Sequence, residues 1–285
     1  MTNAVKKKYI DLHLHSTYSD GTLSIKEIVE YASTQHLAAI SLTDHDCIAG
    51  IREITELAGK VGLEVVPGVE ISSLVETSDI HVLGYFIDYS NTELNERLEE
   101  IRLIRIERAK KIVQRLNDKG VVLRFERVLE FARGYCIGRP HIAQALVAEE
   151  HVNSFTEAFD RYLGNHTEFY IPVQKLNPAE AIALIKCAGG VSVLSHPHVT
   201  DRNDLLEQFV KDGLDGIEVY SPKMTYRQFN FYRQFCHKYN LLETGGSDCH
   251  GPRFNDTMSI GSTKTPYRFL ERMQARIQQH NGASF

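Results

Sequence analysis

Seven short apolar segments recur along this chain of 285 residues, and most of them end in, or are followed directly by, a histidine or a carboxylate. Segments this short, rich in valine, leucine and isoleucine, are typical of strands buried on both faces of a sheet. Helical stretches separate several of them, and Ser24 and Glu27 open one such stretch with the pattern of a capping box. This alternation predicts an α/β fold with parallel strands joined by crossover helices. The expected strands span residues 9–15, 38–43, 63–70, 80–86, 191–196, 216–220 and 242–247.

The middle of the chain departs from this alternation. A long charged helix is expected over residues 94–119, and shorter helices follow at 124–131, 141–150 and 154–163. We interpret residues 89–186 as a helical insertion that shapes a substrate pocket, since long insertions beside an active face commonly do so. Residues 1–88 and 187–285 would then form the barrel body. A connection that is enlarged only for stability is the alternative.

The composition is typical of a protein with a packed core and not of a membrane protein. The formal net charge is −5 and 42% of residues are hydrophobic, which favours a packed core over an extended nucleic-acid surface. No apolar stretch approaches the roughly 20 residues of a membrane helix, and residues 1–8 lack the apolar region of a secretory signal. Five cysteines without a Cys-x-x-Cys pair favour a reducing compartment. We therefore expect a cytoplasmic protein.

Side chains that can bind metals stand where the expected strands end. His13 and His15 are two residues apart on an extended segment, so both point to the same face, although a pair of structural histidines is the alternative. In a parallel α/β barrel the carboxyl ends of the strands converge on one face. We therefore expect nine side chains from distant segments to meet there: His13, His15, Asp20, His45, Glu70, His81, His196, Asp248 and His250.

The chemistry of these ligands narrows the metal. Imidazole and carboxylate without thiolate suit Mn²⁺, our first expectation, and also Fe²⁺ or Zn²⁺. Nine ligands exceed the capacity of one ion, so we expect two or three divalent ions with Glu70 as the bridge. Clustered ions of this kind can clamp the oxygens of a phosphoryl group and activate water.

In their local motifs these residues resemble the PHP (polymerase and histidinol phosphatase) superfamily, over residues 8–88 and 187–265. The resemblance implies a distorted seven-stranded β/α barrel with a trinuclear metal site at its mouth. The motifs are His13-Leu-His15, Asp20, Thr43-Asp44-His45, Pro67-Gly68-Val69-Glu70, His81, Ser195-His196-Pro197 and Ser247-Asp248-Cys249-His250.

The resemblance also implies how the ligands divide among the ions. The first ion would take His13, His15, Glu70 and Asp248. The second would share Glu70 and add His81 and His196. The third would take Asp20, His45 and His250, although many family members have histidine where Asp20 stands. Catalytic roles would fall to Glu70, His196 and Asp248, whereas Asp44 and Asp46 would be supporting or surface groups rather than ligands.

The segment Gly138-Arg139-Pro140-His141-Ile142-Ala143 resembles a PHP subgroup of stand-alone nucleotide phosphoesterases. This implies that Arg139 and His141 bind a substrate phosphate. A helix start with a glycine and an arginine can present donors to an anion, although plain helix capping is the alternative. Arg133 and Lys175 are further candidate cations.

Two other features predict ordinary surface or core. The arginines of 94–119 alternate with glutamates, which is typical of a solvated helix face. The aromatic residues near the end of the chain are expected to pack in the core rather than to stack on a base: Tyr220, Phe229, Phe231 and Tyr232.

Our leading hypothesis is a metal-dependent phosphoesterase. It would remove the 3′-phosphate from nucleoside 3′,5′-bisphosphates, or trim short RNA from the 5′ end. Its partners would be a small nucleotide or a short oligonucleotide, with no membrane. A histidinol-phosphate phosphatase is one alternative, disfavoured because a monophosphate needs no second anion site. A non-catalytic PHP module is another, disfavoured because every ligand position is filled.

Overall fold

The computed structural model describes residues 8–133, 135–172, 176–252 and 258–282, and its body is one curled sheet of eight strands. The strand order in space is β7-β6-β5-β4-β3-β2-β1-β8. The bounds are β1 Tyr9–Leu14, β2 Ala39–Leu42, β3 Glu64–Val75, β4 Ser78–Tyr85, β5 Val191–Leu194, β6 Gly216–Tyr220, β7 Leu242–Gly245 and β8 Thr265–Pro266.

The end of β7 returns to β1 and nearly closes the sheet into a barrel. The His15 backbone N–H donates to the Cys249 carbonyl at 3.0 Å. This close approach requires a glycine, because a Cβ on Gly246 would lie 2.3 Å from the Cβ of His13. The expected barrel is therefore confirmed. The strand count is not, because β8 pairs antiparallel with β1 as an eighth strand.

The direction of β4 differs from the sequence-based expectation. β1, β2 and β3 run parallel, as do β5, β6 and β7, but β4 is antiparallel to both of its neighbours. β3 continues past Glu70 to Val75 and returns through Glu76 and Thr77, which form a hairpin without the usual Asn-Gly or Asp-Gly signal. Because β4 returns beside β3, its first half lies at the same end of the barrel as the carboxyl ends of the parallel strands.

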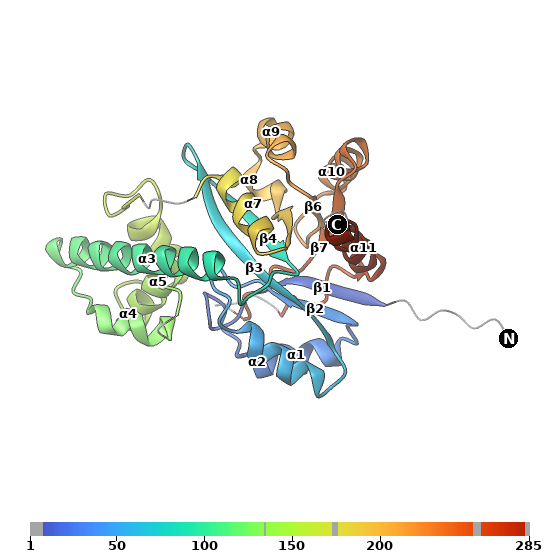
Figure 1. The fold of residues 1–285 in the computed structure, drawn as a ribbon. Coiled ribbons are helices and arrows are strands. Elements are labelled where there is room, and N and C mark those ends of the chain that lie inside the picture. Colours follow the sequence, from blue (N-terminus) through green and yellow to red (C-terminus); the bar gives the residue numbers. More distant parts are fainter. Residues whose placement is uncertain (1–7, 134, 173–175, 253–257, 283–285) are drawn as a thin grey trace.

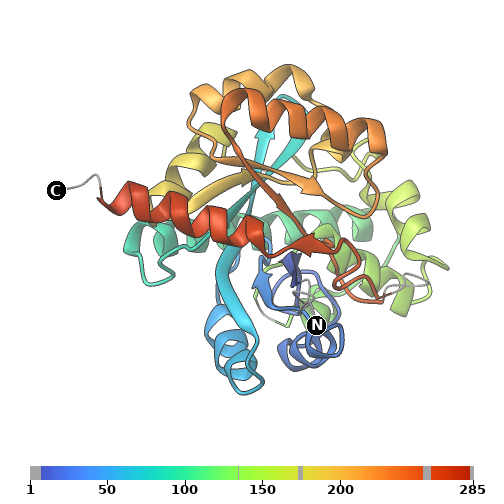
Figure 2. The same ribbon diagram turned by 90° about the vertical axis from the view of Figure 1, so that its right-hand side faces the viewer.

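Helices cover the outside of the barrel (Figures 1 and 2). α1 (Ile25–Thr34) begins with the expected capping box, in which the Glu27 N–H donates to Ser24 Oγ and the Ser24 N–H donates to the Glu27 carboxylate. The other outer elements are α2 Ile51–Gly59, α7 Pro178–Cys187, α8 Pro197–Thr200, η2 Asn203–Leu205, α9 Leu206–Lys211, α10 Tyr226–Tyr239 and α11 Arg268–Gly282. None of the helices in the described ranges combines the length and apolarity that a membrane crossing would require.

Five further helices stand together on one side of the sheet, as Figure 1 shows for α3, α4 and α5. They are α3 Thr92–Asp118, α4 Phe125–Ala132, α5 Arg139–Ala148, α6 Phe155–Ala158 and the π-helical turn η1 Phe159–Leu163. Their apolar side chains, including Leu116 and Leu146, form a cluster separate from those of the barrel. The first turns of α3 and all of α7 pack instead with the barrel strands. The division of the chain at residues 89–186 stays a prediction.

The separate core of these helices gives a stability test. Leu116 is fully buried in α3, whereas Leu103 on the same helix is 51% exposed. We expect Leu116→Ala to lower the free energy of unfolding by about 2–5 kcal/mol, because it leaves a cavity. Leu103→Ala should change it by less than about 0.5 kcal/mol. Urea unfolding followed by circular dichroism measures both, and equal effects would contradict this packing.

Candidate metal centre

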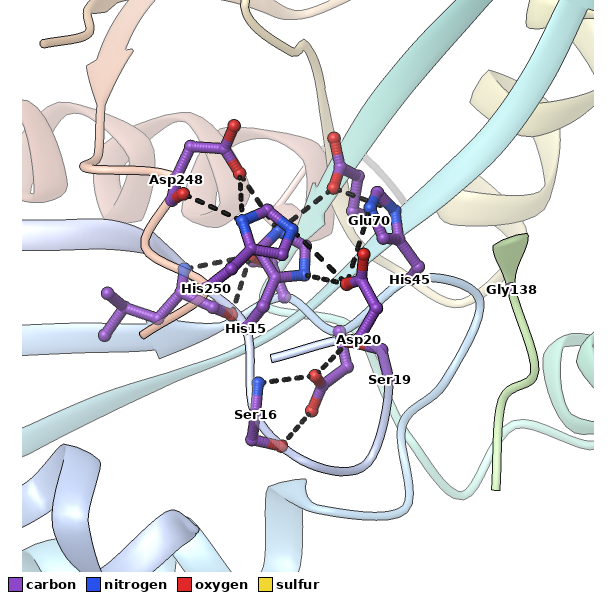
Figure 3. Close-up of polar contacts among 12 residues, drawn as sticks. His15, Ser16, Ser19, Asp20, His45, Glu70, Gly138, Asp248 and His250 are labelled. Carbon is purple, nitrogen blue, oxygen red and sulfur yellow. Dashed lines mark hydrogen bonds and ion pairs between the residues drawn. The ribbon is translucent and has the colours of Figure 1, made fainter. Parts of the chain in front are cut away.

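The structure brings all nine expected ligands together at one end of the barrel, and Figure 3 shows most of them. Three overlapping groups have ligand atoms that lie within 4.8 Å of one another. These groups are His13, His15 and Asp248; His45, Glu70 and His81; and His15, Asp20, His45 and His250. His196 joins through Glu70, with 3.1 Å between His196 Nε2 and Glu70 Oε1.

The first group has the spacing of ligands on a single ion. His13 Nε2 and His15 Nε2 lie 3.1 Å apart, and each is 3.2–3.3 Å from Glu70 Oε2. Asp248 Oδ1 lies 3.4 Å from His13 Nε2 and 3.3 Å from His15 Nε2. Two ligands on one ion are about 3.0–3.4 Å apart when each bond is about 2.1 Å long. These four side chains therefore fit one divalent cation.

Glu70 is the centre of the whole cluster and is fully buried. Its Oε1 accepts from Ser195 Oγ at 2.9 Å and lies 3.1 Å from both His81 Nδ1 and His196 Nε2. Its Oε2 lies 3.0 Å from His45 Nδ1 in addition to the two histidines of β1. One carboxylate thus faces groups from four strands or their ends, so it is placed between all the ligand groups.

The third group surrounds Asp20. Asp20 Oδ1 lies 3.3 Å from His250 Nε2, 3.9 Å from His45 Nε2 and 4.0 Å from His15 Nδ1. The His250 Nδ1–H donates to the Asp248 carbonyl at 3.0 Å, which leaves its Nε2 lone pair facing Asp20. This group is wider than the first, so it fits a cation less tightly.

Buried carboxylates outside the cluster hold the ligands in place. Glu218 on β6 accepts from His13 Nδ1–H at 3.0 Å and from the His196 backbone N–H at 2.8 Å. A carboxylate on the far nitrogen of a histidine fixes its tautomer and its orientation toward a metal. Sequence reasoning missed Glu218, although a lone charge in the apolar strand Gly216–Tyr220 was a usable signal.

Asp44 and Asp46 have the supporting role that was expected of them. Asp44 accepts from the backbone N–H and hydroxyl of Ser16 and from the hydroxyl of Ser19. Asp46 accepts from the Ser72 N–H at 2.8 Å. The Asp46 N–H in turn donates to the Glu70 carbonyl at 2.9 Å, which fixes the loop of His45 against β3.

Burial and neighbouring charges shift the pKa values of several side chains in the cluster. Burial alone would lower the pKa of His15, but hydrogen bonds to Asp248 and Glu70 outweigh it and raise the pKa to about 10. Burial likewise lowers the pKa of His45, in this case to about 3. For Glu70, the imidazoles of His45, His13 and His81 outweigh burial and hold the pKa well below its ordinary value. The Glu70 carboxylate thus stays charged, as a cation site requires.

Three of the residues with a left-handed backbone lie at or beside the cluster. His196, Asp248 and Asp46 have positive φ angles of 25°, 51° and 49°. Residues other than glycine seldom adopt this conformation, and where they do it often marks a functional site. Here the strained backbone turns the side chains at the ends of β5 and β7 inward.

A cleft between the cluster and the helical insertion is lined by three arginines, Arg105, Arg108 and Arg139. Arg105 pairs with buried Asp46 and donates to Ser72 Oγ at 2.9 Å. Arg108 donates from Nε to the Ile171 carbonyl at 2.7 Å, and its guanidinium group lies over the ring of Tyr170. Arg139 donates to the Leu163 carbonyl and to Asn165 Oδ1 at 2.9 and 2.6 Å.

The expectation of a solvated helix face is therefore wrong for Arg105 and Arg108. A usable signal was present in the sequence. Arg102 has Glu99 three residues before it and pairs with it on the surface. Arg105 and Arg108 have no acidic residue three or four positions away on the helix, so no surface pair holds them outward.

The other expected phosphate ligands lie in different settings. His141 is buried, accepts from the Gly138 N–H at Nδ1 (2.9 Å) and donates from Nε2 to the Ser19 carbonyl (2.8 Å). Both ring nitrogens are thus used by the backbone. Arg133 lines a separate hollow with Thr17 and Gln144. Lys175 lies outside the described residues. Their phosphate-binding roles stay predictions.

Comparison with known proteins identifies the family. A model of the PHP domain matches residues 11–176. The chain belongs to the PHP family. The 5′-3′ exoribonuclease of Haemophilus influenzae is 34% identical over 86% of this chain and 91% of the relative. The 3′,5′-nucleoside bisphosphate phosphatase of Chromobacterium violaceum is 31% identical over 85% and 87%, respectively.

Further similarities agree with this assignment. The phosphoribosyl 1,2-cyclic phosphate 1,2-diphosphodiesterase of Eggerthella lenta is 29% identical over 88% of this chain and 97% of the relative. A crystal structure described as a metal-dependent phosphoesterase from Bifidobacterium adolescentis superposes with a TM-score of 0.87 and is 32% identical, covering 94% of this chain and 96% of that one. The resemblance seen in the sequence is confirmed, and this PHP protein is a phosphoesterase.

The Arg105–Asp46 ion pair gives a test of how the insertion is attached. Arg105→Ala would leave Asp46 buried without its cation, so we expect the free energy of unfolding to fall by about 3–5 kcal/mol. Arg102→Ala, on the same helix, removes an exposed pair and should cost less than about 1 kcal/mol. Urea unfolding compares the two variants. Similar small losses would show that the buried pair contributes little.

Proposed function

We propose that this PHP phosphoesterase removes the 3′-phosphate from nucleoside 3′,5′-bisphosphates in a metal-dependent reaction. The observation that carries the proposal is the pairing of two sites in one cleft. A cluster of imidazoles and carboxylates that fits divalent cations lies beside arginines that can hold a second phosphate. The similarity to the bisphosphate phosphatase of Chromobacterium violaceum supports the same substrate class. Trimming of short RNA from the 5′ end is a second reaction that the same arrangement allows.

The ligand set supports two or three divalent ions, for which we propose Mn²⁺, with Fe²⁺ or Zn²⁺ as alternatives. When bound, such ions polarise the phosphoryl oxygens and lower the pKa of a water molecule, which makes it a nucleophile at neutral pH. We assign His13, His15, Glu70 and Asp248 to the first position. His81 and His196 share Glu70 at the second, and Asp20, His45 and His250 form the third.

The residues of the chain would act mainly by positioning. Glu70, His196 and Asp248 would act at the scissile phosphate, and the contacts described above hold them in place. Arg108 and Arg139 would bind the second phosphate. The NH1 and NH2 groups of Arg108 have no hydrogen-bond partner among the described residues, so they are available to an anion. A second contact fixes the orientation of the substrate and so lowers the entropic part of the barrier.

We propose a positioning role for His141. Its two hydrogen bonds join the start of α5 to the loop that carries Asp20. It would hold the arginine side of the cleft at a fixed distance from the cluster. Arg133 would contribute only if a substrate extended into its separate hollow. We also propose a cytoplasmic location, which the five free cysteines support.

The two alternatives make different predictions for substrate use. A histidinol-phosphate phosphatase would release phosphate from histidinol phosphate faster than from adenosine 3′,5′-bisphosphate. A non-catalytic module would release phosphate from neither while it still bound metal. A phosphate-release panel with added Mn²⁺ decides among the three, and elemental analysis of the same sample identifies the ions.

Removal of the bridge tests the metal centre. We expect Glu70→Ala to lose metal and turnover together, because this carboxylate contacts every ligand group. Turnover should fall by at least about 1000-fold, in line with the loss of transition-state charge stabilisation. Glu76→Ala is the matched control, since Glu76 follows the same strand but is exposed and pairs with Arg202. Normal metal content and activity in Glu70→Ala would contradict the bridging role.

Arg108 tests the second phosphate site. Arg108→Ala should raise KM for adenosine 3′,5′-bisphosphate by about 10-fold or more, because a hydrogen bond to a charged group contributes about 1.5–3 kcal/mol. The same substitution should leave KM for 3′-AMP, which has no 5′-phosphate, nearly unchanged. Arg102→Ala serves as the control on the same helix. If KM rose equally for both substrates, Arg108 would not be the residue that binds the second phosphate.

A further inference from the structure

The metal centre opens on a second side, away from the arginine cleft. His196, Asp248 and His250 of the cluster also line a hollow with Ser221, Lys223 and Ser259. The arginine cleft is lined by a different part of the cluster, Asp20, His45 and His81. A substrate whose scissile phosphate lies at the cluster can therefore extend in both directions. A site for terminal phosphates alone would need only one of them.

The second hollow continues into a third, more apolar one. Ser221 lines both, and it lies between β6 and α10. The loop before β8 contributes to both as well, through Ser259 in the first and Thr263 in the next. The two hollows therefore form one continuous surface that leads away from the metal centre.

Aromatic rings line the far part of this surface. Tyr226 at the start of α10 is 80% exposed, and Phe229 lies beside it with its ring 27° from parallel. Tyr220 contacts Phe229 edge to face. The expectation that the four aromatic residues of this region pack in the core holds for Tyr232, which is 1% exposed. It holds in part for Tyr220, which packs against the barrel core and also lines this hollow. Phe229 is half-buried and lines the hollow, and the expectation is wrong for Phe231, which is 43% exposed.

We propose that this surface, from Lys223 to Tyr226, binds the downstream nucleotides of a single-stranded RNA whose 5′ end lies in the arginine cleft. The inference rests on the proposed function and specifies its substrate class. Lys223 is an exposed cation placed between the metal centre and the rings. A cation followed by an exposed aromatic ring offers contacts to a phosphate and to a base of a flexible single strand.

The polarity of the strand follows from the two sides of the centre. The 5′-phosphate of the first nucleotide would occupy the arginine cleft, and the phosphate on its 3′ side would lie at the cluster. Hydrolysis breaks the bond between that phosphorus and the 3′ oxygen of the first nucleotide, which is the same bond that breaks in a nucleoside 3′,5′-bisphosphate. Water supplies the new P–O bond and the proton of the leaving 3′-hydroxyl, so the first nucleotide leaves as a 5′-monophosphate and the shortened strand keeps a 5′-phosphate. The downstream strand would leave over Lys223 and Tyr226. A nucleoside 3′,5′-bisphosphate would occupy only the arginine cleft and the cluster.

The test measures binding of 5′-phosphorylated oligoadenylates of one to six nucleotides with phosphorothioate linkages, so that turnover does not interfere. Affinity of the purified protein, followed by fluorescence anisotropy, should rise with length. Lys223→Ala should lower the affinity for the hexanucleotide about tenfold and reduce the slope of log K against log salt by about 0.7. Tyr226→Ala should lower the affinity about tenfold without changing the slope, because a base stacks on the ring without neutralising a phosphate.

The matched controls are Lys26→Ala and Tyr89→Ala, which alter exposed residues on α1 and before α3. Both should bind the hexanucleotide as the unaltered protein does. Affinity that is independent of length, or equal behaviour of all four variants, would overturn the inference. Phosphate release from adenosine 3′,5′-bisphosphate is measured on the same preparation. Release without length dependence overturns only the RNA surface, whereas length dependence without release overturns only the proposed phosphatase activity.

Discussion

A single buried carboxylate organises this protein. Glu70 has no exposed surface, and its two oxygens face the imidazoles of His13, His15, His45, His81 and His196. A charge in such a place is unfavourable unless it is surrounded by compensating groups. The surrounding elements supply them: β1 on one side, the loop after β2, the antiparallel β4, and the end of β5. The direction of β4 is part of this arrangement, because only a returning strand places His81 beside Glu70.

The helical insertion is joined to this centre through a second buried charge. Arg105 of α3 pairs with Asp46. Both the backbone N–H and the side chain of Asp46 are hydrogen bonded to the backbone of β3. The same helix carries Arg108, and α5 carries Arg139, so one attachment positions both guanidinium groups relative to the metal ligands. His141 makes a second attachment through Gly138 and Ser19. Together these contacts set the distance between the two phosphates that a substrate of this protein would present.

The two sides of the centre differ in charge and in exposed rings, so they suit different parts of a substrate. The arginine side is narrow, cationic and held by buried contacts, which suits one terminal phosphate. The side of Lys223 and Tyr226 is open, with one cation and exposed rings, which suits a strand of variable length. A bisphosphate and an RNA end would then both occupy the arginine cleft and the metal centre, and only the RNA would extend over Lys223 and Tyr226. On this proposal, one site would serve both activities that are named among the relatives, a phosphatase and an exoribonuclease.

The sequence by itself determined the barrel, the family and the set of side chains that meet at the centre. The reason is that strand periodicity and the residue types at strand ends are local properties, and parallel strands place those ends on one face. Only the tertiary structure decided the direction of β4, the part played by Glu218, and the inward placement of Arg105 and Arg108. It also decided that both nitrogens of His141 are used by the backbone. These outcomes depend on which polar groups from distant segments come within hydrogen-bond distance. Spacing along the chain indicates that Glu218, Arg105 and Arg108 have no local partners, but it does not identify the distant groups that they meet.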